Sequence, residues 1–235
     1  MLGNVGLNGY VKASQDEPAR MWVHDFGGTG AQKQVVEFFK GDTSYPVAGR
    51  DDIVKLVPPL RSRYPSYKAF GAATVESIFA ADELRRAQRR EARTFASTIA
   101  LAGPDGRFTL RPLPAEAQLA PVYASLAADL DGDGTTDLLL GGNQYGVPPM
   151  FGRFDASYGL LLRGLGGGRF APLDPAAGGV TIDGQVRALA LVRRAGGERL
   201  IMVARNGAGV QFLRPRATRS LAALGPRATD RDSSR

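Results

Sequence analysis

Four aspartates stand close together between two apolar runs, in the stretch ADLDGDGTTDLLL at residues 128–140. Numbered as a loop, this stretch offers oxygen ligands at positions 1, 3, 5, 7 and 9: Asp129, Asp131, Asp133, the carbonyl of Thr135, and Asp137. Calcium binds about six to eight oxygens, and alternate residues of a tight loop aim their carboxylates at one centre. The spacing therefore predicts a calcium site, with a solvated acidic turn as the alternative.

The flanks of this loop indicate which elements hold it. An EF-hand loop has a glutamate at its twelfth position and a helix on each side, whereas the twelfth residue here is Leu140. The runs PVYASLAA before the loop and DLLLGG after it are short, apolar and bounded by proline or glycine, as strands are. We therefore expect the loop to link two antiparallel strands, with Gly132 and Gly134 supplying the positive φ angles of the turn.

Composition limits the class of protein. The chain has 235 residues and is 43% hydrophobic, which suffices for one or two ordinary cores. It contains no cysteine, so disulfides and thiolate metal sites are excluded. No apolar run approaches the roughly 18 residues of a membrane-spanning helix, and the first ten residues lack the charged and apolar regions of a signal peptide. We expect no membrane span, and the chain shows no export signal of its own.

The net charge of +7 raises the question of nucleic acid binding. Arginines concentrate at 83–93, where they mix with Glu83 and Glu91 as on a solvated helix face, and again in the polar tail at 215–235. The composition of that tail favours disorder. Neither cluster is interleaved with the stacking aromatics or the reading helix that a nucleic-acid binder uses. We therefore expect no nucleic acid partner.

Similar layouts recur along the chain. Short apolar runs separated by Gly, Asp, Asn and Pro favour antiparallel β structure. Residues 94–114 and 159–174 both run from an apolar strand through a glycine-rich turn and an Arg-Phe pair into a second strand. In the last segment, 184–214, a hairpin turn RRAGGER replaces the acidic loop. Units of roughly 40 to 60 residues are too small to bury their own faces, so neighbouring units must stack.

An earlier segment, 21–39, aligns with the acidic loop through Asp25 and Asp129. It keeps the first aspartate and the later glycine, Gly30, but other residue types replace the remaining acids: Gly27, Thr29 and Lys33. One carboxylate beside a lysine is a poor calcium site. We therefore expect a loop that kept its turn and lost its ion, with Lys33 supplying positive charge instead.

The stretch DLDGDGTTDLLL followed by LLLRGLGGGRF resembles the FG-GAP, or VCBS, repeat of extracellular β-propellers. The chain is similar to the C-terminal part of bacterial VCBS-repeat proteins, including those grouped with the cartilage acidic protein family. The resemblance covers residues 1–214 and is most specific over 122–173. It implies an all-β fold, a partial β-propeller of about three to four FG-GAP-like blades with a small helical insertion. It also implies a set of calcium ligands: Asp129, Asp131, Asp133, Thr135 and Asp137.

The expected organisation follows the blades. In chain order we expect an incomplete blade and the start of the next with its degenerate calcium loop (1–46), a helical insertion (47–93), the remainder of that blade (94–121), a blade with the intact loop (122–178), a last blade (179–214) and a disordered basic tail (215–235). In the insertion, Asp51 or Asp52, Thr74 and Asp82 are candidate helix caps.

About three and a half blades are too few to close a propeller. Open blade edges also tend to pair with other strands. We therefore expect the chain to be a fragment or the C-terminal half of a longer protein, and to need upstream blades of that same protein.

Catalytic constellations are weak in this sequence. The one histidine, His24, adjoins Asp25 at a strand end, where a structural role is favoured over catalysis. The spacing of Glu116, Asp155 and Asp174 does not single out a carboxylate pair for glycoside cleavage. We therefore expect a binding module and not an enzyme.

The family resemblance implies where such a module works. It implies a calcium-binding adhesion module that acts outside the cytoplasm, secreted, periplasmic or at the cell surface, with a glycan or a surface protein as partner. The alternatives are a part of a larger extracytoplasmic polysaccharide-processing enzyme and a pure structural scaffold.

Overall fold

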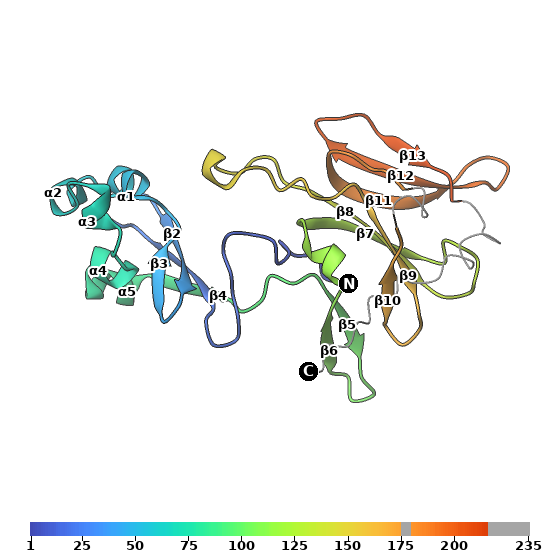
Figure 1. Cartoon of the computed structure of the whole chain (residues 1–235), viewed down its shortest axis with the longest axis horizontal. Helices are drawn as coiled ribbons and strands as arrows, with labels where there is room; N and C mark the ends of the chain where they lie inside the picture. Colours follow the sequence, from blue (N-terminus) through green and yellow to red (C-terminus); the bar gives the residue numbers. More distant parts are fainter. Residues whose placement is uncertain (175–179, 216–235) are drawn as a thin grey trace, which may run out of the picture. The chain divides into compact units, whose positions relative to one another are not determined.

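The computed structural model describes residues 1–174 and 180–215 (Figure 1). Strands account for 37% of the residues and helices for 15%, so the chain is mostly β, as the all-β prediction requires. The strands form several antiparallel sheets, none of which closes on itself within the described part. The tail predicted to be disordered lies, apart from Pro215, outside the described residues.

The chain divides into two compact units. Unit 1 comprises Met1–Gly9 and the described residues from Ala96 onward, and unit 2 comprises Tyr10–Phe95. No helix in the described ranges is both long enough and apolar enough to span a membrane.

Unit 2 is a four-stranded antiparallel sheet packed against short helices. The strand order is β3-β2-β1-β4. The strands are β1 (Ala19–His24), β2 (Lys33–Lys40), β3 (Thr43–Pro46) and β4 (Gln88–Ala92). The helices are α1 (Arg50–Leu56), α2 (Leu60–Arg63), α3 (Tyr67–Phe70), α4 (Val75–Ile78) and α5 (Ala81–Arg86). One core joins sheet and helices and includes Phe26, Ile53 and Val75, each at most 1% exposed.

The expected helical insertion at 47–93 contains these five helices and ends in β4. Thr74 caps α4 as predicted, because its hydroxyl accepts a hydrogen bond from the N–H of Ser77. The other predicted caps are wrong: α1 begins after Gly49 and α5 after Ala80, so the candidate aspartates lie inside the first turns. There they still favour the helices through the helix dipole.

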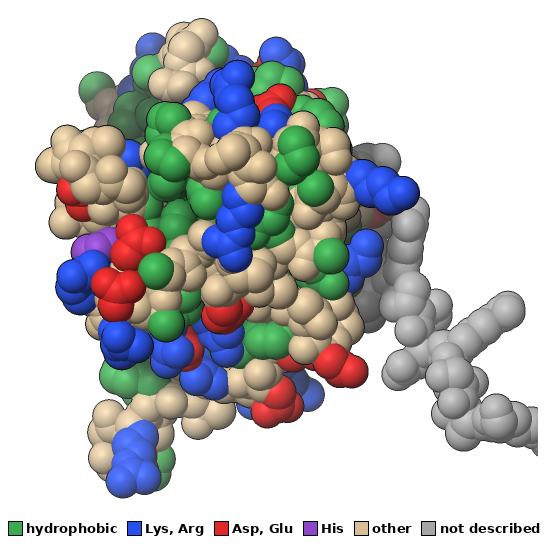
Figure 2. All heavy atoms as spheres, turned by 90° about the vertical axis from the view of Figure 1, so that its left-hand side faces the viewer, with side chains coloured by type: hydrophobic (Ala, Val, Ile, Leu, Met, Phe, Trp, Pro, Cys, Tyr) green, Lys and Arg blue, Asp and Glu red, His purple; other side chains and the backbone are tan. Residues whose placement is uncertain are grey.

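The arginine-rich segment 83–93 does not form the single solvated helix face expected from its composition. It is divided between α5 and β4, because its second half pairs with the open edge of β1. Its arginines pair with nearby acids, as in Arg86–Asp82 and Arg93–Glu91. Figure 2 shows basic side chains interspersed with acidic and apolar ones on the face drawn there.

Unit 1 consists of three sheets that follow one another along the chain. The first is the hairpin of β5 (Thr98–Ala102) and β6 (Phe108–Pro112). The second is a four-stranded meander in the order β10-β9-β8-β7, made of β7 (Val122–Ala128), β8 (Asp137–Gly142), β9 (Leu160–Gly164) and β10 (Phe170–Pro172). The third is made of β11 (Gln185–Arg193), β12 (Arg199–Asn206) and β13 (Gln211–Leu213). Two short 3₁₀ turns, Ala115–Gln118 and Pro149–Phe151, lie between strands.

Strand β8 is buried along its whole length because both faces of its sheet are covered. Leu139 packs into a core with residues of the third sheet, including Val186 and Val203. Leu138 and Leu140 point to the opposite face and share a core with Ile99 of the β5–β6 hairpin. A continuous apolar run is what a strand covered on both faces needs. The middle sheet, which carries the acidic loop, is thus held from both sides.

Residues 94–121 were expected to complete the blade that begins within residues 1–46. Their strands, β5 and β6, belong to unit 1, whereas β1, β2 and β3 belong to unit 2. Strand β2 finds its partner locally, in β3 across the tight turn at Gly41, whose φ is 62°. The closure of a short loop costs less conformational entropy than pairing with a strand more distant in the chain.

Candidate metal centre

The acidic loop lies between β7 and β8, which pair antiparallel up to Ala128 and Asp137. The prediction that it links two antiparallel strands is therefore confirmed. Gly132 and Gly134 have φ angles of 84° and 86°, as the turn was expected to require. Leu130 is 9% exposed and points into the core beneath the loop. The turn is thus fixed by strand pairing, glycine conformation and one apolar anchor.

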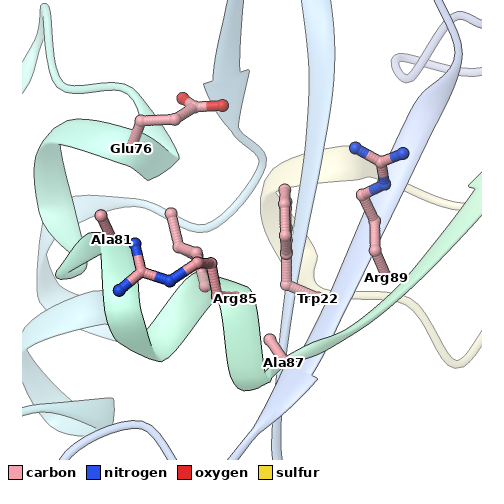
Figure 3. A pocket seen from close by; sticks show the side chains of 7 residues that line it. Trp22, Glu76, Ala81, Arg85, Ala87 and Arg89 are labelled. Carbon is pink, nitrogen blue, oxygen red and sulfur yellow. The ribbon is translucent and has the colours of Figure 1, made fainter.

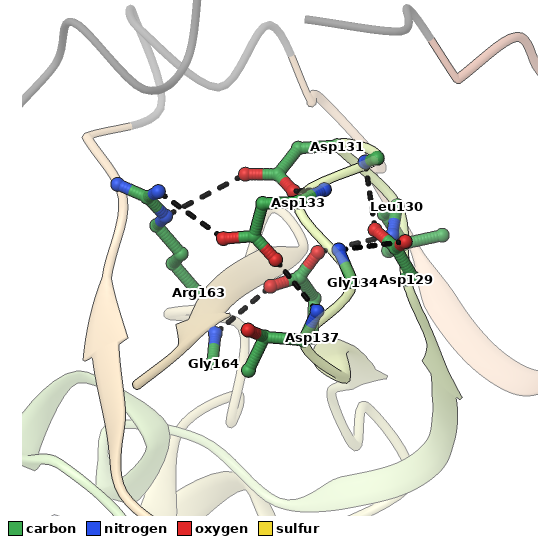
Figure 4. Close-up of polar contacts among 10 residues, drawn as sticks. Asp129, Leu130, Asp131, Asp133, Gly134, Asp137, Arg163 and Gly164 are labelled. Atoms are coloured by element: carbon green, nitrogen blue, oxygen red, sulfur yellow. Dashed lines mark hydrogen bonds and ion pairs between the residues drawn. The ribbon is translucent and has the colours of Figure 1, made fainter. Parts of the chain in front are cut away.

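Three of the predicted ligands converge. Asp129, Asp131 and Asp137 each place one carboxylate oxygen within 4.8 Å of the others (Figure 4). Asp131 and Asp137 are buried. A set of carboxylate oxygens from one short loop is the donor chemistry that calcium prefers. The residues present therefore fit a hard divalent cation, and Asp129, Asp131 and Asp137 are the side chains placed to hold it.

Backbone N–H groups orient two of these carboxylates. Asp129 accepts hydrogen bonds from the N–H groups of Gly132 (2.7 Å) and Gly134 (3.1 Å). Asp137 accepts one from Leu130 (3.0 Å) and one from Gly164 of β9 (2.8 Å). Both side chains are therefore held in place by the fold itself. Such preorganisation is what a binding site needs from its supporting residues.

The electrostatics of Asp137 differ from those of a solvated acid. Burial raises the pKa of the Asp137 carboxyl, and the charges of Asp131 and Asp133 raise it further, although hydrogen bonds from two backbone N–H groups oppose this. A raised pKa means that the ionised form is disfavoured by its surroundings. A bound cation would remove that penalty.

Asp133 lies outside the convergent group. Its Oδ1 accepts a hydrogen bond from the N–H of Thr135 at 2.7 Å, and its Oδ2 accepts one from Arg163 at 3.2 Å. The N–H of Thr135 is the main cause that lowers the pKa of Asp133, with Arg163 adding to it. Asp133 and Thr135 therefore lie in the predicted loop, but the carboxylate of Asp133 is turned toward Arg163 (Figure 4).

Two arginines at this loop were not predicted from the sequence. Arg163 of β9 lies beside Asp131 and Asp133, and Arg199 of β12 donates a hydrogen bond to the carbonyl oxygen of Asp129 at 2.9 Å. The strand register would have identified Arg163, because Leu162 pairs with Leu138 and this pairing places Arg163 beside Asp137. That register becomes available only once the pairing of β8 with β9 is known.

The loop that follows β1 resembles the acidic loop in its strand pairing and in two of its glycines, although Gly27 at the third position has a φ of 86° where the acidic loop has Asp131. Its flanking strands pair His24 with Lys33, just as Ala128 pairs with Asp137. Gly28 and Gly30 have φ angles of 65° and 79°, matching Gly132 and Gly134. In both loops the first aspartate accepts a hydrogen bond from the N–H of the sixth residue, which is Gly30 for Asp25, at 2.7 Å.

The two loops differ at the ninth position. In unit 2 this position holds Lys33, whose ammonium donates to the carbonyl oxygens of Phe26 at 2.8 Å and Leu56 at 2.6 Å. In unit 1 it holds Asp137, which accepts a hydrogen bond from Leu130. Phe26 and Leu130 occupy the same second position of their loops. The lysine thus supplies positive charge within the earlier loop, as the sequence suggested.

A pocket of about 490 Å³ lies in unit 2 (Figure 3). The residues that line it come from β1, the helices and β4: Trp22, Glu76, Ala81, Leu84, Arg85, Ala87 and Arg89. The guanidinium of Arg89 lies 5.9 Å from the centre of the Trp22 ring, at the range of a cation–π contact. Its lining combines apolar side chains with the charged side chains of Glu76, Arg85 and Arg89, and includes no residue of the acidic loop.

The other acidic and basic candidates for chemistry are dispersed. His24 ends β1, as predicted, and its ring packs edge-on against Phe26 at 5.5 Å between ring centres. Within the described ranges, the acidic group close enough to share one ion is Asp129, Asp131 and Asp137. Glu116, Asp155 and Asp174 are outside it. The acidic loop of unit 1 is therefore the candidate functional site.

No family model, curated protein or solved structure matches the chain.

Proposed function

We propose that this chain is a calcium-binding module of the FG-GAP, or VCBS, repeat type that acts as a binding or adhesion module outside the cytoplasm. The observation that carries the calcium part is the convergence of Asp129, Asp131 and Asp137 within 4.8 Å on a loop held by backbone hydrogen bonds. Carboxylates gathered so closely repel one another unless a cation lies among them.

The contacts of the loop support a structural role for the ion. Through Gly164 and Arg199, the loop is bonded to β9 and β12 as well as to its own strands. An ion that fixes the loop would therefore brace the middle sheet against the third one. Extracellular calcium suits a site of modest affinity, because extracellular modules bind it with dissociation constants of about 10⁻⁴ to 10⁻³ M.

The arrangement of unit 1 supports the repeat type. Its three sheets are consecutive in the chain, and the middle one packs against both neighbours. Propellers are built from four-stranded antiparallel sheets that follow one another along the chain. In the described part of the chain, the middle sheet has four such strands, and its neighbours have two and three. The shared geometry of the loops at Asp25 and Asp129 also supports a common repeat ancestry, with the ion lost from the first loop.

We test the calcium site first by thermal unfolding. In wild type, saturating calcium should raise the melting temperature of unit 1 by about 5 °C or more, because binding to the folded state alone stabilises it. Asp131→Asn removes one charge from the buried part of the site and should abolish most of that gain. Asp105→Asn is the matched control, since Asp105 lies exposed in the β5–β6 turn. An undiminished gain in Asp131→Asn would overturn the proposed site.

The adhesion role is tested separately, because it rests on the family resemblance. Immobilised glycans and surface proteins should retain the chain in a saturable way in calcium. A chelator should reduce that retention, because the loop would lose its ion. Equal binding with and without calcium would show that adhesion does not depend on an ion in the acidic loop. The absence of binding across a broad panel would favour a purely structural role.

A further inference from the structure

We propose that Arg163 is an internal counter-cation that competes with the bound ion for the carboxylates of Asp131 and Asp133 and thereby sets the calcium affinity of the loop. This inference rests on the proposed calcium function. It concerns a side chain from a different strand, β9, that lies outside the ligand loop itself.

The contacts of Arg163 define its position. Its Nη2 donates a hydrogen bond to Oδ2 of Asp133 at 3.2 Å, and its Nε lies 3.5 Å from Oδ2 of Asp131. The side chain of Arg163 is 22% exposed, and that of Asp131 is 5% exposed. The guanidinium therefore lies at the partly buried edge of the acidic cluster (Figure 4), where water screens charges less than at an open surface.

The Nε atom of Arg163 gives an independent indication of this role. It is buried and has no hydrogen-bond partner, because its contact with Asp131 is an ion pair without hydrogen-bond geometry. A buried donor without a partner is unfavourable. Arg163 is therefore held beside the loop by its hydrogen bond to Asp133 and by the attraction between its charge and the two carboxylates, without a hydrogen bond from Nε.

Arg163 also helps to orient Asp133. Asp133 lies outside the convergent group of Asp129, Asp131 and Asp137. Of the four aspartates, it is the one whose carboxylate accepts a side-chain hydrogen bond from Arg163, while its other oxygen accepts one from the N–H of Thr135. A divalent ion that recruits Asp133 has to replace Arg163 as its partner. The two cations therefore compete for the same acidic side chains.

This competition has opposite effects on the two states of the site. Without an ion, the guanidinium offsets part of the repulsion among the carboxylates and stabilises the folded loop. With an ion bound, the same positive charge repels the ion at short range. The removal of the charge should therefore lower the stability of the calcium-free protein and raise the affinity for calcium.

The test is calorimetric titration of calcium into the full chain, with thermal melts of the same samples. Arg163→Gln should lower the dissociation constant about fivefold or more. It should also lower the melting temperature without calcium and enlarge the gain that calcium produces. Arg169→Gln is the matched control: Arg169 lies exposed in the β9–β10 turn, and its loss changes the net charge equally. In the control, screening should keep the dissociation constant within about twofold.

A second measurement covers the case in which Arg163→Gln does not fold. Arg163→Lys keeps a positive charge and should retain a calcium affinity close to that of wild type. The resonance that its NMR spectrum lacks identifies the Nε–Hε group of Arg163. In wild type that resonance should shift as calcium saturates the loop. An unshifted resonance, or an unchanged dissociation constant in folded Arg163→Gln, would overturn the role of Arg163 while leaving the calcium site intact. Failure of wild type and Arg163→Gln alike to bind calcium would overturn the proposed function itself.

Discussion

The first aspartates of the two loops, Asp25 and Asp129, have similar backbone partners but different cations nearby. Asp25 and Asp129 both cap the turn by accepting hydrogen bonds from backbone N–H groups. In unit 2 the neighbouring cation is Lys33, the ninth residue of the same loop. Its ammonium donates hydrogen bonds to two carbonyl oxygens. In unit 1 the loop has more acids than basic partners. The residue at position nine therefore determines whether the loop contains its own cation, as with Lys33, or a further carboxylate, as with Asp137.

The role of Asp25 as a cap predicts a specific pH dependence for unit 2. The hydrogen bond from the N–H of Gly30 is the main cause that lowers the pKa of Asp25, with Thr29 and Lys33 contributing. An acid whose pKa is lower in the folded state stabilises the fold above its ordinary pKa of about 3.9, and that stabilisation is lost as pH falls through the lowered value. Asp25→Asn should thus destabilise unit 2 at neutral pH and progressively less below about pH 4.

Thermal melts followed by Trp22 fluorescence measure this effect, because Trp22 lies in the same unit as Asp25. Asp42→Asn is the control, since Asp42 lies exposed in the β2–β3 turn. A difference between wild type and Asp25→Asn that stays constant from neutral to acidic pH would show that the charge of Asp25 is not what stabilises the turn.

The convergence of three aspartates was predictable from the sequence because their spacing is local. Asp129, Asp131 and Asp137 were identified by their positions within one loop, and the structure brings them together. The orientation of Asp133 was not predictable, because it depends in part on Arg163, a residue of another strand. A single sequence shows which residues share a loop, whereas it shows cross-strand neighbours only after the strand register is known.

At the scale of elements, the sequence predicted the hairpin turns better than it predicted how the strands pair into sheets. The turns before Arg107, Arg169 and Arg199 each join two antiparallel strands, as their glycine-rich sequences indicated. The pairing of β1 with β4 was not foreseen, because the composition of residues 83–93 indicated a charged helix face. Strand pairing at the open edge of the sheet here overrides the high helix propensity of Gln, Arg, Glu and Ala. Local turn chemistry is therefore the more reliable signal in this chain.

The end of β9 links its sheet to the acidic loop, which makes Gly164 a sensitive position. Its N–H donates to Asp137, and a Cβ built at Gly164 would lie 2.2 Å from the carbonyl oxygen of Thr136. Gly164→Ala should therefore force the backbone apart, destabilise unit 1 by about 1 to 3 kcal/mol and weaken calcium binding. Denaturant unfolding and calcium titration measure the two effects.

Gly209→Ala is the control for this substitution, because no atom within 4 Å would meet the added methyl group and Gly209 belongs to the same unit. If Gly164→Ala matched wild type in both stability and calcium affinity, the hydrogen bond from β9 would be irrelevant to the loop.

At the scale of the whole molecule, the chain combines two units of different construction. Unit 1 stacks three sheets around the buried strand β8, and unit 2 covers one sheet with helices. The mostly β character followed from the sequence, because short apolar runs and glycine-rich turns recur along the chain. The division at Gly9 and Phe95 did not, because it depends on which strands pair across long sequence separations.

The division into units also allows calcium to be followed in each unit separately. The acidic loop lies in unit 1, whereas Trp22, the one tryptophan of the sequence, lies in unit 2. Far-ultraviolet circular dichroism reports on the strands of both units. Tryptophan fluorescence, excited where tyrosine does not absorb, reports on unit 2 alone.

The most direct single measurement is the thermal unfolding of wild type, with chelator and with saturating calcium, recorded by both signals. We expect calcium to move one circular dichroism transition upward by about 5 °C or more and to leave the Trp22 transition unchanged. That result would place the stabilising ion in unit 1, where Asp129, Asp131 and Asp137 converge. The absence of any shift, or a shift of the Trp22 transition alone, would contradict a calcium site at the loop between β7 and β8.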